Sequence, residues 1–182
     1  TRYWRDWSSD VCSSDLTICY DLAGLLDRQR GWGRAEETFH CRNAMAVLGK
    51  ASWFNLGDRD LATHLYRTER LRAGARLSEV TAELCGRWKI AGRVLPMTDD
   101  RVRTIVIMDD GDVPFQEFFV HRRHAGAVHG VRFEGASACL PGPGVIAAIE
   151  EAGVVIVAPS NPVTSVGPIL AVPGIEETLA GT

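Results

Sequence analysis

This sequence of 182 residues lacks long hydrophobic runs, closely spaced cysteines and an excess of either charge. No apolar stretch is long enough to span a bilayer, and no charged segment leads into an apolar one as in a secretion signal. The net charge is −3, from 20 basic and 23 acidic residues, so charge gives no reason to expect binding to nucleic acid or to an anionic membrane. We therefore expect a cytoplasmic protein that binds neither nucleic acid nor membrane.

Cysteine is too scattered to build a zinc cluster or a disulfide framework. Cys19, Cys41, Cys85 and Cys139 are far apart, and no pair has the C-x-x-C spacing of metal or redox sites. We predict reduced thiols that are mostly buried.

The first residues do not have the character of natural protein sequence. Residues 5–16, RDWSSDVCSSDL, look like the in-frame translation of a widely used sequencing-adapter oligonucleotide, and the match extends over the whole dodecapeptide. Segments of this origin are excluded from reasoning about a fold. We therefore assign residues 1–16 to the adapter and residues 17–182 to the central part of a single domain.

Helices and strands are both predicted in the remainder, which is long enough for one core. The whole chain is 46% hydrophobic. Helical signals cover residues 17–26, 35–48, 60–73, 78–87, 143–152 and 174–180. Short β-rich runs cover residues 93–97, 102–108, 114–120, 128–133 and 154–157, with a hairpin turn at 109–112. The pattern predicts an α/β fold with a mixed sheet. A nucleotide-binding sheet normally has more strands, so we expect truncation at both ends.

The last predicted strand leads into a loop of small polar residues. Residues 154–157 are all Val or Ile, which is typical of a strand inside a parallel sheet that helices cover on both faces. Ligands of such sheets bind beyond the carboxyl ends of the strands, where loops present backbone N–H groups and hydroxyls to phosphates. The candidate nucleotide-binding residues are Ser160, Asn161, Thr164 and Ser165, and Pro168 is suited to the first turn of a following helix. A Pro-rich crossover loop without a ligand is the alternative.

A second candidate site lies at the start of the predicted helix over residues 60–73. Asp60, His64 and Arg67 share one helical face, and an acid, an imidazole and a guanidinium side by side can hold a polar ligand. A capped surface helix with intrahelical ion pairs explains the same residues. Arg59 fits that alternative less well, because a basic residue at a helix start opposes the dipole preference.

A third candidate combines a hydroxyl with two adjacent carboxylates. Thr98, Asp99 and Asp100 follow a short predicted strand, and hard oxygen ligands of this kind suit Mg²⁺ held together with substrate phosphates. A simple turn is the alternative interpretation.

Together these segments resemble one family, in order and in spacing. The motifs GDRDLATHL (57–65), LPMTDD (95–100) and APSNP-x-TS-x-GPILAVPG (158–174) are similar to those of the 2-phospho-L-lactate transferases of coenzyme F-420 biosynthesis. The likeness extends from Thr17 to the end of the chain and includes the stretch that ends in Arg-Gly-Trp-Gly at 30–33. It implies a Rossmann-like nucleotide-binding core within the α/β class, and a possible homodimer.

The resemblance also implies an activity and its ligands. It implies Mg²⁺-dependent transfer of a phospholactyl or phosphoenolpyruvyl group from a guanylylated donor to the deazaflavin Fo, with release of GMP. Arg59, Asp58, Asp60 and His64 would then bind the deazaflavin, and Ser160, Asn161, Thr164 and Ser165 the guanine nucleotide. Asp99 and Asp100 would contact the metal. No residue is identified as a general base.

The sequence departs from the family at its N-terminal end. The expected strand and Gly-rich turn are absent, and Leu16 occupies the position before Thr17 where the family has an aspartate. We therefore expect this polypeptide itself to be inactive, although its parent gene encodes an enzyme. A non-catalytic nucleotide or nucleotide-sugar regulator of the same superfamily is the alternative function, and aggregation through uncovered sheet edges is a further expectation.

Overall fold

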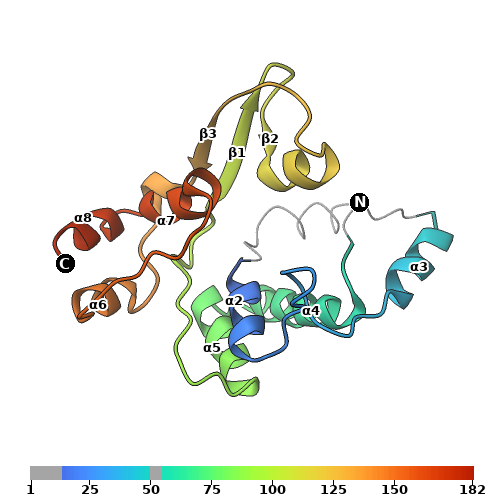
Figure 1. The fold of residues 1–182 in the computed structure, drawn as a ribbon, viewed down its shortest axis with the longest axis horizontal. Coiled ribbons are helices and arrows are strands. Elements are labelled where there is room, and N and C mark those ends of the chain that lie inside the picture. Colours follow the sequence, from blue (N-terminus) through green and yellow to red (C-terminus); the bar gives the residue numbers. More distant parts are fainter. Residues whose placement is uncertain (1–13, 50–54) are drawn as a thin grey trace. The chain divides into compact units, whose positions relative to one another are not determined.

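In a computed structural model of the chain, the structure describes residues 14–49 and 55–182. The chain divides after Val94 into two compact units, one spanning Ser13–Val94 and the other containing Leu95–Thr182 (Figure 1). The region that we assigned to the adapter lies outside the described residues except at its end, residues 14–16.

The unit Ser13–Val94 is helical in its described part. Its helices are α2 (Ser14–Leu22), α3 (His40–Val47), α4 (Asp58–Arg72) and α5 (Leu77–Arg87). Leu16 and Tyr20 of α2 pack against Val80 and Leu84 of α5, and these four residues are at most 4% exposed. The Tyr20 ring also lies 5.3 Å from that of Trp88, so a small core joins α2 to α5 and to the residue that follows it.

The ends of α4 and α5 follow ordinary helix chemistry. Helix α4 carries Asp58 and Asp60 in its first turn and Arg70 and Arg72 in its last, which complements the helix dipole. Helix α5 begins one residue before the predicted Ser78, because Glu79 accepts a hydrogen bond from the backbone N–H of Arg76 at 2.9 Å. The predicted helices over 60–73 and 78–87 are thus confirmed.

The other unit contains a three-stranded antiparallel sheet in the order β2-β1-β3 (Figure 1). The strands are β1 (Arg103–Met108), β2 (Val113–Pro114) and β3 (Val128–Glu134). Ile105 pairs with Pro114 in one ladder and with Arg132 in the other. The hairpin turn predicted at 109–112 connects β1 to β2, and a cluster built on Val106, Met108 and Val113 forms the core beside the sheet.

Short helices follow the sheet. They are the 3₁₀ turn Ala136–Ala138, α6 (Val145–Glu150), the π-helical turn η3 (Pro162–Val166), α7 (Gly167–Leu170) and α8 (Ile175–Ala180). Cys139, Val172 and Ile175 form the buried centre of a second cluster in this unit, with Met97, Val102 and residues of α6 around it. The helices predicted over 143–152 and 174–180 are confirmed with slightly shorter bounds.

Two predicted strands are wrong. Residues 93–97 form no strand, and of residues 114–120 only Pro114 belongs to one. The chain instead enters a helical turn, η1 (Glu117–His121). Pro114 has no N–H to extend the ladder, and Phe115 and Phe119 stack at 5.4 Å between ring centroids, which is the i,i+4 contact of a helix.

The predicted strand over residues 154–157 is also not formed. In the described part of the chain no strand pairs with this segment, and Val154 and Ile156 are 77% and 85% exposed. The α/β class is confirmed, but the described sheet is antiparallel.

The thiols are as predicted where the structure describes them. Cys19, Cys85 and Cys139 are buried, Cys41 is exposed, and all four are free. The Sγ atoms of Cys19 and Cys85 lie 3.8 Å apart, and burial together with Cys85 raises the pKa of Cys19 to about 12. Among the described helices, none combines the length and apolar character that a membrane crossing requires.

Candidate functional site

The first turn of α4 is built by reciprocal capping with α3. The carboxylate of Glu37, upstream of α3, accepts hydrogen bonds from the backbone N–H groups of Arg59 at 2.8 Å and Asp60 at 2.7 Å. In return Asp58 accepts from His40 N at 2.9 Å, Cys41 N at 3.1 Å and the Thr38 hydroxyl at 2.6 Å. The Thr38 bond is the main reason that the pKa of Asp58 is lowered, so Asp58 acts here as an ionised cap of α3.

Gly57 makes this arrangement possible. Its backbone is extended, with φ −79° and ψ 165°, and any L-residue can adopt that conformation. A Cβ at this position would overlap the carboxyl end of the Glu37 side chain. The glycine is therefore needed for close approach of Glu37 to the α4 N-terminus.

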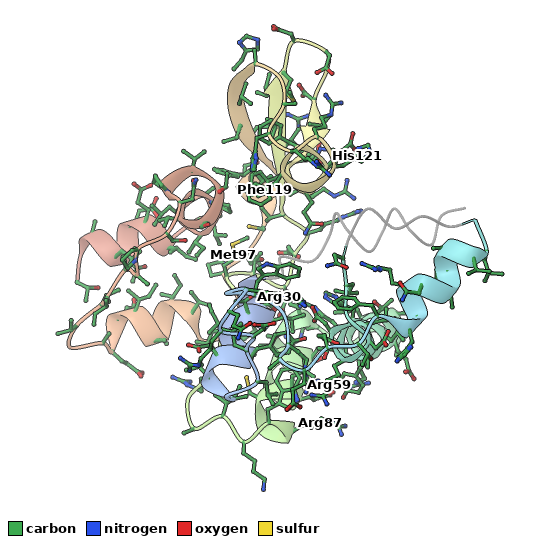
Figure 2. All side chains as sticks on the ribbon, turned by 45° about the vertical axis from the view of Figure 1, so that its right-hand side comes forward. Arg30, Arg59, Arg87, Met97, Phe119 and His121 are labelled. Atoms are coloured by element: carbon green, nitrogen blue, oxygen red, sulfur yellow. The ribbon has the colours of Figure 1, made fainter. Side chains whose placement is uncertain are left out.

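Arg59 lies at the start of α4 with its side chain half exposed (Figure 2). Its Nη1 donates to Glu36 Oε2 at 3.0 Å and to the carbonyl of Ala35 at 3.3 Å. Glu36 has a left-handed backbone with φ +54°, which is unfavourable for a residue with a Cβ. An exposed ion pair contributes about 0–1 kcal/mol, while a left-handed non-glycine residue costs about 1–2 kcal/mol. The Glu36–Arg59 pair alone does not offset this strain.

Asp60 and His64 belong to a largely buried polar group that also includes Tyr20 of α2. The Tyr20 hydroxyl donates to Asp60 Oδ1 at 2.6 Å, and His64 Nε2 lies 3.7 Å from the same oxygen. Burial, followed by the Asp60 charge, raises the pKa of Tyr20. Burial also lowers the pKa of His64, although the Asp60 charge acts in the opposite direction, so we treat His64 as neutral at pH 7.

Arg67 continues this face of α4 into the interior and is 2% exposed. Its Nη1 lies 3.1 Å from Asp15 Oδ2, and among the described residues its Nε and Nη2 make no hydrogen bond. Asp60, His64 and Arg67 do share one face, as predicted. That face lies against α2 through Tyr20 and Asp15, and His64 also makes the i,i+4 contact with Asp60 that the alternative of a capped helix with intrahelical ion pairs describes.

The loop over residues 158–168 is positioned by its own turn and by β3. Asn161 Oδ1 accepts from Val163 N and Thr164 N, each at 2.9 Å, and so caps the turn η3. Pro168 stands in the first turn of α7 as predicted, and Gly167 lies where a Cβ would press on the ring of Phe133. Ser160, Asn161 and Ser165 are exposed and Thr164 is half-buried. The structure thus presents short polar groups at a helical turn rather than along an open loop.

Asp100, one of the two acidic residues after Thr98, bonds to a part of the chain that is distant in sequence. Asp100 Oδ2 accepts from Leu140 N at 2.9 Å, and the buried Thr98 hydroxyl donates to the Leu140 carbonyl at 2.6 Å. Within residues 14–49 and 55–182, no three His, Cys, Asp or Glu side chains come together as a metal site. The backbone N–H of Asp100 donates to the Thr98 hydroxyl at 3.1 Å, which supports the turn interpretation of residues 98–100, and the metal contact stays a prediction.

The structure brings together some predicted site residues and not others. Asp58, Arg59, Asp60 and His64 form one group in the unit Ser13–Val94, while Ser160, Asn161, Thr164, Ser165, Asp99 and Asp100 belong to the other unit. Sequence reasoning missed Tyr20, Glu36 and Glu37. These residues touch α4 only through the fold, and no periodic pattern links them to it.

The fold is shared with known structures. A Bacillus halodurans protein described as a member of the UPF0052 family superposes with a TM-score of 0.56 at 20% identity, over 88% of this chain and 47% of that chain. The likeness defines the class of fold and no more.

Sequence comparison identifies the family. Residues 15–182 match the family described as 2-phospho-L-lactate transferase CofD, and the chain belongs to this family. The chain is 49% identical over 175 residues to the phosphoenolpyruvate transferase of Streptomyces coelicolor, covering 93% of this chain and 55% of that protein. It is 48% identical over 180 residues to the phosphoenolpyruvate transferase of Nocardia farcinica, covering 94% and 54%. The chain therefore spans about half the length of these curated relatives.

Proposed function

We propose that the protein to which this chain belongs transfers a phospholactyl or phosphoenolpyruvyl group from a guanylylated donor to the deazaflavin Fo, with release of GMP, in coenzyme F-420 biosynthesis. The observation that carries this proposal is the family match over residues 15–182, which includes all three predicted motifs. The relatives cited above carry the name phosphoenolpyruvate transferase, which favours the enolpyruvyl donor.

In this proposal Arg59 is the direct contact to the deazaflavin. It is the half-exposed cation at the start of α4, and its guanidinium can donate to a ring carbonyl. Asp58, Asp60 and His64 then shape the site: Asp58 caps α3, and the other two lie in the buried polar group with Tyr20.

The guanine nucleotide is assigned to the turn at residues 160–165. Ser160, Thr164 and Ser165 supply hydroxyl groups, and Asn161 orders the backbone N–H groups of the turn. Mg²⁺ is the proposed cofactor, with Asp99 and Asp100 as its protein ligands, and it would neutralise phosphate charge. Asp100 gives one oxygen to Leu140 N, which leaves Oδ1 for such a role. Transfer at phosphorus depends mainly on positioning and charge neutralisation, so no general base is assigned.

A transfer assay tests the proposal. The protein, extended at both ends to the length of its relatives, is incubated with Fo, Mg²⁺ and each guanylylated donor, and the product is followed by chromatography with fluorescence detection. Product with either donor supports the transferase and identifies the donor. No product from folded protein that still binds a nucleotide would contradict it and favour the regulator. We expect the 182-residue chain, assayed in parallel, to be inactive.

A further inference from the structure

Three consecutive residues before α3 contact Arg59, two at its guanidinium and one at its backbone N–H. The Ala35 carbonyl accepts from Nη1 at 3.3 Å, Glu36 Oε2 accepts from the same nitrogen at 3.0 Å, and Glu37 Oε2 accepts from the backbone N–H at 2.8 Å. Residues 35–37 thus hold both the main chain and the guanidinium of Arg59.

Among these three residues, Glu36 has a backbone conformation that is not explained by a gain in stability. Its backbone is left-handed, and its side chain is 80% exposed, where an ion pair adds little stability. Strained backbone of this kind is found preferentially at binding and catalytic sites, where the surrounding structure maintains it.

The geometry leaves a defined edge of the guanidinium for a ligand. Both side-chain contacts that Arg59 makes to the described residues use Nη1. Because the guanidinium is planar and rigid, the contacts at Nη1 restrain the directions in which Nη2 and Nε donate. Fixing a long side chain before binding reduces the entropy lost when the ligand binds.

We infer that Glu36 is a positioning residue for Arg59, and that its left-handed backbone keeps its carboxylate on Nη1 so that the guanidinium is oriented toward a ring carbonyl of the acceptor. The identity of the acceptor rests on the proposed function. The conformational order of the Arg59 side chain does not depend on the proposed function.

The substitution Glu36→Gly tests this role, because glycine adopts the left-handed backbone without strain but has no carboxylate. In the protein extended to the length of its relatives, we expect the free energy of unfolding to stay level or rise. The affinity for Fo, measured by fluorescence titration, should fall about fivefold. Glu36→Gln keeps an acceptor oxygen and should bind within about twofold of the parent. A purely structural role would not increase stability while weakening binding.

Two controls separate positioning from loss of charge. Asp21→Asn removes another exposed ion pair of the same unit, Asp21–Arg28, and should leave binding unchanged. In an Arg59→Ala background, Glu36→Gly should have no further effect on binding. Additive effects of the two substitutions would overturn the inference.

A second readout is independent of Fo. The side-chain Nε–H signal of Arg59 in ¹⁵N-labelled 182-residue chain should show a lower heteronuclear NOE in Glu36→Gly than in the parent. Unchanged order would overturn the inference even if Fo binds. If the extended parent protein does not bind Fo, the proposed function fails, and the NOE comparison still decides the role of Glu36.

Discussion

Tyr20, Asp60 and His64 form a buried polar group on one side of α4. The Tyr20 hydroxyl is the close donor to Asp60, at 2.6 Å, and both residues are under 10% exposed. A buried carboxylate is costly unless it accepts hydrogen bonds. These residues therefore hold α2 against α4 in one arrangement.

We predict that Tyr20→Phe destabilises the chain by about 1–3 kcal/mol, because Asp60 loses its buried donor while the ring packing is kept. Denaturant unfolding monitored by circular dichroism measures the change. The control is Tyr66→Phe, whose hydroxyl contacts Glu83 at a partly exposed position. This change should cost about 1 kcal/mol or less, since water can replace the partner. Equal losses of stability in the two variants would show that the burial of Asp60 does not determine the cost of Tyr20→Phe.

His64 predicts a pH dependence of stability. Its pKa in the folded chain lies below the ordinary 6.5, mainly because of burial. The unfolded state therefore binds the proton more readily, so the contribution is fully present above pH 6.5 and is lost as pH falls through the folded pKa. Unfolding titrations between about pH 7.5 and 5.5 should show a smaller loss of stability in His64→Gln than in the parent. The same slope in both proteins would contradict the assignment.

At the scale of elements, the junction of α3 and α4 depends on exchanged caps. Glu37 caps α4 and Asp58 caps α3, although each residue is remote in sequence from the helix that it caps. Capping groups each contribute about 0.5–2 kcal/mol. The pair therefore fixes how one short helix meets the next.

Gly57→Ala should destabilise the chain by about 1–3 kcal/mol, because the new Cβ displaces Glu37 and removes both of its backbone hydrogen bonds. The matched control is Gly86→Ala in α5, where the added Cβ meets no atom within 4 Å. There we expect a gain of up to about 1 kcal/mol from helix propensity. Thermal unfolding of both variants measures the difference, and a shift of the same sign in both would refute the capping explanation.

At the scale of the whole molecule, residues 154–157 are an apolar segment without a sheet partner in the described part of the chain. Ile156 is 85% exposed, and the run Val-Val-Ile-Val has high β-propensity and no charge. Such segments pair with other chains when they are exposed.

We expect the 182-residue chain to self-associate, and Ile156→Lys to suppress this without lowering unfolding stability. Light scattering against protein concentration measures the association. Val47→Lys changes a valine that is 87% exposed on α3, and it should have little effect. Equal suppression by both lysines would indicate a general effect of charge instead of edge pairing.

Local patterns predicted much of the fold. The helices α4 and α5, the strands β1 and β3 and the turn between β1 and β2 follow from periodicity, charge placement and turn residues close together in sequence. The failures at 114–120 and 154–157 have different origins: after Pro114 the chain turns into a helix, whereas residues 154–157 have no partner strand among the described residues. An apolar run becomes a strand only if a partner strand is available, and its own residues do not supply one.

The same distinction between local sequence pattern and tertiary packing applies to the candidate site. Sequence alone identified the family motifs, the shared face of Asp60, His64 and Arg67, and the small polar residues at 160–165, because these are properties of neighbouring residues. Only the tertiary structure decided that Asp58 serves as a cap of α3, that Tyr20 reaches Asp60, and that Glu36 holds Arg59. Those contacts join residues 17 to 40 positions apart, and side-chain chemistry at that separation is set by how the helices pack.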